Sequence, residues 1–264
     1  MGNGLFSKKF IGLVGVCTAL VIFVCYLFFD LRIVMVIKRA MGMPKSMLTI
    51  MDEVPTQLYF DKILPIAKRN GVSVGCNVEP WHVNNWNAWS KVSLKDCLDA
   101  GLEVIPMHVT FEDNNGILRD KAAYERQVVE EKHFFDNAGI KTDVVVMPWR
   151  SSNQAFARDV LMKHYQATFV RWWEGLHSWP LKSKSEIKEW ITGFDKPMNF
   201  EEMKRFVDCI QYDNGWGTLM IRSWRTEMMT LEALVDLEKT IQYAKQQGVE
   251  VVSLREGLKR FARD

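Results

Sequence analysis

Apolar residues recur along most of this chain in short runs, separated by longer stretches with the spacing of amphipathic helices. The short runs predict strands at 47–50, 72–78, 103–109, 143–147, 167–172, 218–223 and 249–254. The longer stretches predict helices at 56–69, 94–100, 119–137, 200–210 and 231–247. Four of these helices run into a glycine, a common stop signal; the glycines are Gly71, Gly101, Gly139 and Gly248.

This alternation of strands and helices favours βα units around a mainly parallel sheet. About seven such units fit between residues 46 and 264, so the sequence predicts one α/β domain, a distorted seven-stranded (β/α) barrel. The stretch 174–211 interrupts the alternation as one long irregular insertion. Asn199 precedes a helical pattern inside it and is expected to cap that helix.

A different pattern occupies the N-terminal part of the chain. Residues 10–29 carry no charge, and about 20 apolar residues suffice for a helix to cross a bilayer. No small-residue cleavage site follows them, which favours a transmembrane anchor over a signal peptide. The predicted organisation is a tail at 1–9, an anchor at 10–29, a connector at 30–45 and the barrel domain at 46–264. Basic residues flank the anchor on both sides and leave its orientation open.

The composition of the chain limits the classes of molecule that it is expected to bind. The 264 residues carry a formal net charge of +2, and no basic stripe indicates nucleic acid. Ten tryptophans suit either a large core or a surface that stacks sugar rings. Four of them lie at or near strand ends and are candidate sugar-binding residues, although packing under the insertion explains them equally well; they are Trp81, Trp149, Trp172 and Trp224.

Candidate metal ligands also follow the predicted strands. Asp52 ends the first strand, and His108 and Glu112 follow the third. The carboxyl ends of parallel strands converge on one face, and an Asp/His/Glu set suits zinc, or manganese, nickel or cobalt. Asp52 also fits a helix cap before Pro55, and Glu112 also fits a solvated loop carboxylate. For His108 we favour metal or substrate contact.

The order of motifs resembles that of the polysaccharide deacetylase family, the NodB-homology fold of carbohydrate esterases, over residues 46–262. That family opens with a strand ending in Asp-Asp-Gly, in whose place this chain has 48–53, Leu-Thr-Ile-Met-Asp-Glu. Its His-x-x-x-His motif corresponds to 101–112, and its Pro-aromatic motif to 147–149. Its last motif, an apolar strand ending in His, corresponds to 220–222. The resemblance implies a NodB-type barrel, and the apolar run 10–29 predicts one transmembrane helix before it.

Within that resemblance, the departures concern the catalytic residues. Met51 stands where the family has its general base, and Arg222 stands where it has its catalytic histidine. Asp52 and His108 retain two metal-ligand positions, while Glu112 replaces the second histidine. The resemblance therefore implies a metal site without the usual acid and base.

Two functions follow, of different kinds. The first is a membrane-anchored, metal-dependent hydrolase that removes acyl groups from a polysaccharide or acylated amino sugar. Zinc, manganese, nickel or cobalt would lower the pKa of a bound water. Glu53 or Glu79 would replace the missing base, and Arg222 would stabilise an oxyanion.

The alternative is a catalytically inactive deacetylase-like protein, without a metal, that binds glycan or scaffolds a polysaccharide-assembly complex. A third reading is a hydrolase of another bond, with Arg222 holding a phosphate or carboxylate. The predicted anchor places the protein at the cell membrane. The resemblance implies that the domain lies outside the cytoplasm, because its expected ligand is a cell-envelope glycan.

Overall fold

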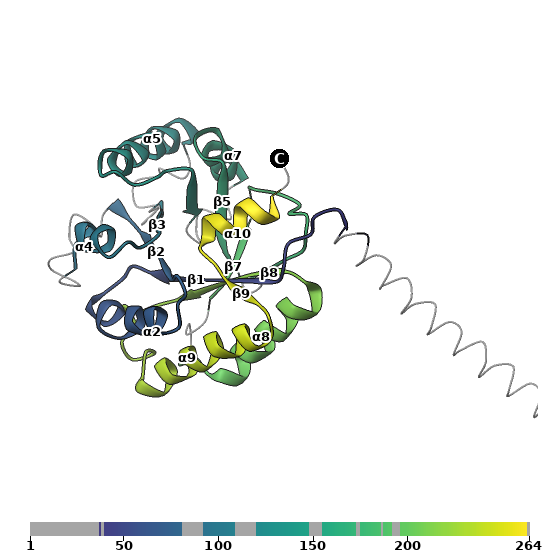
Figure 1. The fold of residues 1–264 in the computed structure, drawn as a ribbon. Helices are drawn as coiled ribbons and strands as arrows, with labels where there is room; N and C mark the ends of the chain where they lie inside the picture. Colours follow the sequence, from purple (N-terminus) through teal and green to yellow (C-terminus); the bar gives the residue numbers. More distant parts are fainter. Residues whose placement is uncertain are drawn as a thin grey trace, which may run out of the picture. The chain divides into compact units, whose positions relative to one another are not determined.

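The chain divides into two compact units, Met1–Pro44 and Lys45–Asp264. In the computed structural model, the described residues are 37, 40–80, 92–108, 120–147, 155–172, 175–185, 187–191 and 196–262. They give a central sheet with helices around it, all within the second unit (Figure 1).

The sheet is mainly parallel, as the alternation of strands and helices predicts. Its hydrogen-bonded path runs β3-β2-β1-β8-β7-β5-β4, with β9 beside β1 and a short antiparallel β6 beside β8. The strands are β1 (Met47–Glu53), β2 (Gly75–Val78), β3 (Val104–Pro106), β4 (Val144–Met147), β5 (Ala167–Trp172), β6 (Leu176–His177), β7 (Ile187–Ile191), β8 (Trp216–Ile221) and β9 (Glu250–Val251).

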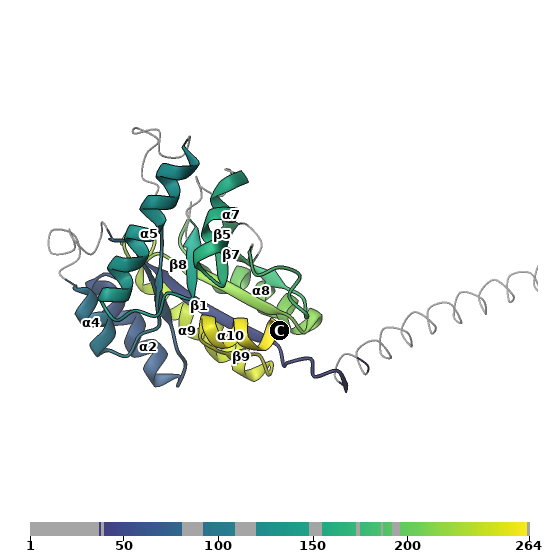
Figure 2. The same cartoon turned by 90° about the horizontal axis from the view of Figure 1, so that it is seen from above.

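Helices follow most of these strands. In both views α8 lies beside α9, and α5 packs against α7 (Figures 1 and 2). The helices are η1 (Tyr59–Ile63), α2 (Leu64–Arg69), α4 (Leu94–Asp99), α5 (Lys121–Asn137), α7 (Ala155–His164), α8 (Phe200–Asp213), α9 (Leu231–Gln246) and α10 (Leu254–Phe261). Helix α7 has no counterpart in the predicted helices.

The predicted seven-stranded barrel behind a transmembrane helix is wrong for the described part of the chain. Its sheet has nine strands, because the insertion 174–211 contributes β6 and β7. Strands β3 and β4, at the two ends of the path, are joined by a single bridge between Met107 and Val146, and a regular barrel is not formed. None of the described helices is long and apolar enough to cross a membrane. The predicted anchor, 10–29, lies outside the described residues.

The ends of the helices confirm the stop and cap residues predicted from the sequence. The four glycines predicted as stops all adopt positive φ, between 59° and 78°, a conformation that costs glycine little because it has no Cβ. The predicted cap is also present: the Asn199 side chain accepts a hydrogen bond from the backbone N–H of Glu202 at 3.0 Å. These ends depend on neighbouring residues alone, which explains why the sequence predicts them.

The two faces of β1 meet different surroundings. Leu48 and Ile50 belong to a core cluster with helix residues such as Leu237, so even-numbered positions of β1 face the helices. Odd-numbered positions face the opposite way, because side chains alternate along a strand. On that inner side, the Trp216 indole donates to the Thr49 hydroxyl at 2.9 Å.

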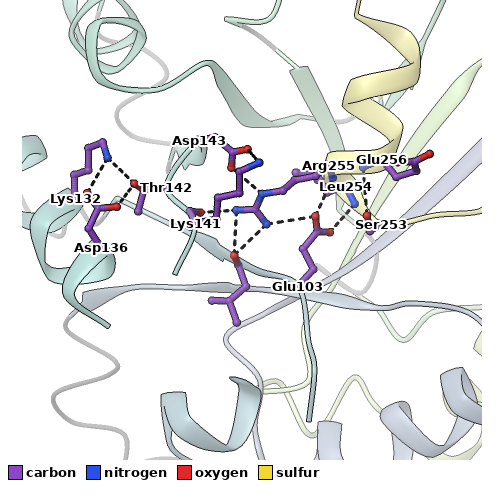
Figure 3. Close-up of polar contacts among 11 residues, drawn as sticks. Glu103, Lys132, Asp136, Lys141, Thr142, Asp143, Ser253, Leu254, Arg255 and Glu256 are labelled. Carbon is purple, nitrogen blue, oxygen red and sulfur yellow. Dashed lines mark hydrogen bonds and ion pairs between the residues drawn. The ribbon is translucent and has the colours of Figure 1, made fainter. Parts of the chain in front are cut away.

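Helix α10 is fixed at the starts of β3 and β4 by a polar network, the strand-start network (Figure 3). The Glu103 carboxylate accepts from the backbone N–H groups of Leu254 at 2.6 Å and Arg255 at 2.9 Å. The Arg255 guanidinium donates to Asp143 at 2.7 Å and to the carbonyl of Lys141 at 2.5 Å. The network caps a helix and joins it to two strands.

Candidate functional site

The first predicted ligand, Asp52, lies on the helix-facing side of β1. It is fully buried, and its two carboxylate oxygens accept from the Ser223 backbone N–H at 2.8 Å and from the Ser223 hydroxyl at 2.5 Å. Burial raises the pKa of Asp52 to about 8, against 3.8 for an ordinary aspartate, despite the opposing effect of these two hydrogen bonds. Asp52 therefore ties the end of β1 to the end of β8.

Glu53, the next residue, faces the opposite side and forms a buried ion pair. The Arg222 Nε donates to Glu53 Oε2 at 2.6 Å, and the two side chains are only 9% and 8% exposed. Arg222 directly follows β8, whose Ile221 pairs with Asp52 in the sheet register. The Arg222 guanidinium carbon also lies 5.8 Å from the centre of the half-buried Trp224 ring. We call Glu53 and Arg222 the strand-end pair.

His108 lies beyond the end of β3, turned toward α5 and α7. Its Nδ1 contacts the Glu131 carboxylate, and its Nε2 lies 3.1 Å from the Tyr165 hydroxyl. The ring is 2% exposed and meets the Tyr165 ring edge to face. Both ring nitrogens are therefore engaged by residues of the helical layer.

A further residue near the strand-end pair is absent from the sequence-based candidates. Asn77 on β2 pairs with Glu53 in the sheet register and is fully buried. Its Nδ2 lies 3.6 Å from the Met220 sulfur, and its Oδ1 has no hydrogen-bond partner among the described residues. In the sequence, this residue stands out only as a single amide within the short run Gly-Cys-Asn-Val.

The remaining predicted site residues are only partly described. Glu79 follows β2 directly and is buried, with 5% exposure. The Trp224 ring is half-buried beside Arg222 and Arg225. Glu112, Trp81 and Trp149, and the side chain of Trp172, lie outside the described residues, and their roles stay predictions.

The described residues do not fit the predicted metal centre. The carboxylate oxygens of Asp52 and the ring nitrogens of His108 are held by different partners in different parts of the domain. In the described ranges no three His, Cys, Asp or Glu side chains come together as a ligand set.

Comparison with known proteins gives a match in structure alone. No protein-family model matches the sequence, and no curated protein matches it. The catalytic domain of a peptidoglycan N-acetylglucosamine deacetylase from Eubacterium rectale is similar, with a TM-score of 0.51 and 13% identity over 80% of this chain and 89% of that one.

Two more solved structures agree. The Xyl-CE4 domain of a multidomain xylanase, from the hindgut metagenome of Trinervitermes trinervoides, gives a TM-score of 0.56 and 12% identity, covering 82% of this chain and 91% of that one. A CE4 family pseudoenzyme from Bacillus anthracis gives 0.52 and 16%, covering 84% and 68%. This chain therefore has the fold of the CE4 polysaccharide deacetylases, the NodB-type carbohydrate esterases, in a divergent form.

Proposed function

We propose that this protein is a divergent deacetylase-like domain that binds a glycan without hydrolysing it. The observation that carries the proposal is the strand-end pair, Glu53 and Arg222, a buried ion pair at the end of the sheet where parallel α/β folds place their chemistry. A guanidinium stays charged at any working pH and cannot transfer a proton. Its partner carboxylate is already neutralised.

The backbone supports a shift in the motif register. Val54 has φ 56°, a left-handed conformation that a β-branched residue rarely adopts and glycine adopts readily. If Val54 takes the place of the glycine in Asp-Asp-Gly, the two acidic positions fall on Asp52 and Glu53, and Met51 is no longer one of them. In this register the second acidic residue is the one that pairs with Arg222.

The sheet register also decides which side chains at the end of β3 lie on the side of Glu53. Val104 pairs with Cys76, which pairs with the helix-facing Asp52, so His108 falls on the helix-facing side. Met107 then falls on the side of Glu53, and it is fully buried. A thioether is a soft ligand, unsuited to the cations that prefer carboxylate and imidazole. This arrangement supports the inactive alternative over the metal-dependent hydrolase.

For the ligand we propose a polysaccharide with acylated amino sugars, bound outside the cytoplasm. The support is the fold, which this chain shares with the catalytic domain of a peptidoglycan N-acetylglucosamine deacetylase. Trp224 beside the strand-end pair offers a ring on which a sugar could stack.

The test uses the purified full-length chain. Calorimetry would measure binding of N-acetylglucosamine oligomers, and a separate assay would measure acetate release with zinc, manganese, nickel or cobalt added. We expect binding without acetate release, and binding weakened by about tenfold in Trp224→Ala. Tyr212→Ala, an 85% exposed aromatic on α8, is the matched control and leaves affinity unchanged. Metal-dependent acetate release that Asp52→Asn abolishes would instead establish the hydrolase.

A further inference from the structure

Two of the three cysteines in the described part of the chain share one apolar cluster. Cys76 on β2 and Cys97 on α4 are both 0% exposed, and both are thiols in this structure. The cluster around them also holds apolar side chains from β2, β3, α4 and α5. The third cysteine, Cys209, is exposed on α8. The proposed glycan binding uses neither of the two buried thiols.

The backbone brings the two buried cysteines together through the turn between α4 and β3. The Cys97 carbonyl accepts a hydrogen bond from the backbone N–H of Leu102 at 3.1 Å. The carbonyl of the next residue, Glu103, accepts from the Cys76 N–H at 2.9 Å. Cys76 also pairs with Val104 in the sheet register. Two successive residues therefore hold both cysteine backbones, and the strand and the helix are fixed next to each other at these positions.

The side chains of the two cysteines interact as well. A hydrogen bond to the Cys97 side chain, followed by burial, raises the pKa of the Cys76 thiol well above its usual value. In the described ranges no three His, Cys, Asp or Glu side chains form a metal-binding set, so these thiols are not part of one there. A disulfide requires the two β-carbons to lie about 4 Å apart, and interacting thiols on adjacent backbone segments suit that requirement.

We propose that Cys76 and Cys97 form an intramolecular disulfide that joins β2 to α4 and stabilises the domain. The oxidant is glutathione disulfide or another small disulfide. In two exchange steps through a mixed disulfide, it takes up the two electrons and two protons of the cysteine thiols and leaves as two small thiols. The proposed location outside the cytoplasm provides conditions in which such bonds persist. Because the bond requires no glycan, its test is separate from that of the proposed function.

Burial determines when the bond forms. Both thiols are fully buried in the folded domain, and the raised pKa of Cys76 keeps its sulfur protonated, whereas the thiolate is the form that reacts. The small disulfide therefore reacts with the chain before this cluster closes during folding. Once the domain has folded, the same burial shields the Cys76–Cys97 bond from reductants.

The experiment refolds the full-length chain from denaturant, either with an excess of glutathione disulfide or with a thiol reductant. Free thiols are then alkylated, and the chain is digested with trypsin, which cuts after Lys91 and Lys95 and leaves the two cysteines on different peptides. Mass spectrometry identifies linked peptides, and thermal unfolding measures the stability of both forms. The variant is Cys97→Ala, and the matched control is Cys209→Ser, which removes the exposed thiol.

In the oxidised wild type we expect the peptides of Cys76 and Cys97 to be linked to each other. The oxidised form should melt about 5–10 °C above the reduced form, because the bond closes a loop of the unfolded chain. Cys209→Ser should give the same linked peptides and the same rise in melting temperature. Cys97→Ala should show no linked Cys76 peptide and no difference in melting temperature between the two conditions.

Two results would overturn the inference. Alkylation of both Cys76 and Cys97 in the wild type refolded with glutathione disulfide would mean that the two thiols serve only as apolar core residues. A linked form that melts no higher than the reduced form would mean that the bond strains the domain instead of stabilising it. The comparison of oxidised and reduced wild type decides both points even if Cys97→Ala fails to fold.

Discussion

Among the described residues, two glutamate–arginine pairs have low exposure, one at each end of the strands. At the strand ends, Glu53 and Arg222 are 8% and 9% exposed; at the strand starts, Glu103 and Arg255 are 10% and 20% exposed. The second pair belongs to the strand-start network, where Glu103 also caps α10 (Figure 3). The first pair lies beside an amide, Asn77, whose oxygen has no partner among the described residues.

The partners of the two ion pairs show that the pair at the strand starts stabilises the fold, while the pair at the strand ends lies at the proposed binding site. At the strand starts, Glu103 and Arg255 hydrogen-bond to backbone groups of other elements, so the two charges stabilise the fold whatever the protein binds. At the strand ends, the charges of Glu53 and Arg222 neutralise each other, and the neighbouring Asn77 amide oxygen accepts no hydrogen bond from the described residues. Buried amide oxygens almost always accept a hydrogen bond, so Asn77 differs from the hydrogen-bonded groups at the strand starts.

The largest expected effect is at the strand starts. Glu103→Ala removes the acceptor of two α10 backbone N–H groups and leaves Arg255 without its carboxylate there. We expect the free energy of unfolding to fall by about 4 kcal/mol. Adding Arg255→Met should not restore it, because the helix cap is still missing. Thermal unfolding monitored by circular dichroism measures the change, with Glu256→Ala as a control of little effect, because the half-buried Glu256 pairs only with a partly exposed Arg260 among the described residues.

At the strand ends we expect a smaller loss in the free energy of unfolding, one that a second substitution restores. Arg222→Met leaves the Glu53 carboxylate buried without its ion-pair partner, at a cost of about 3 kcal/mol. The double variant Glu53→Met/Arg222→Met should return to within about 1 kcal/mol of the wild type, because two apolar side chains replace two charges. If the double variant recovers no better than the strand-start one, the two pairs play the same structural role.

The smallest effect is a pH dependence from Asp52. Its pKa is about 8 in the folded chain against an ordinary 3.8, so between these values the folded state holds a proton that the unfolded state has released. This group therefore favours folding most below pH 4, and its contribution is lost as the pH rises through 8. Asp52→Asn resembles the protonated carboxyl group and can still hydrogen-bond with the backbone N–H and the hydroxyl of Ser223.

The measurement is the melting temperature of Asp52→Asn and wild type from pH 5 to pH 9. We expect the stability of Asp52→Asn relative to the wild type to increase as the pH rises, by at least about 1 kcal/mol in the free energy of unfolding between pH 5 and pH 9. A difference that stays constant with pH would mean that the carboxylate is ionised throughout, as a metal ligand or an ion-pair partner would be.

Much of the fold was open to prediction. Strands β1 to β5, β8 and β9 have counterparts in the apolar runs, and the four glycine stops have positive φ. Strands β6 and β7 were missed, because they are short and lie in the insertion 174–211 without a clear alternation of their own. Their strand conformation depends on pairing with β8 and β5, which are distant in the sequence.

The site was predicted less well. The sequence places Asp52, Glu53 and His108 near strand ends, but a change of one residue reverses the face on which a side chain lies. Asp52 and His108 consequently face the helical layer, while Glu53 meets Arg222. Asn77 gave no signal beyond being one polar residue in an apolar strand.

The sequence alone determined the parallel α/β character of the domain, its helix ends and the motif order of the deacetylase fold, because these depend on periodicity and on local backbone preferences. Only the tertiary structure decided which charged groups meet. Glu53 and Arg222 are 169 positions apart, and their contact depends on the register of β1 against β8. That register, with the burial it imposes, pairs Glu53 with Arg222 and gives Asp52 and His108 separate partners among the described residues.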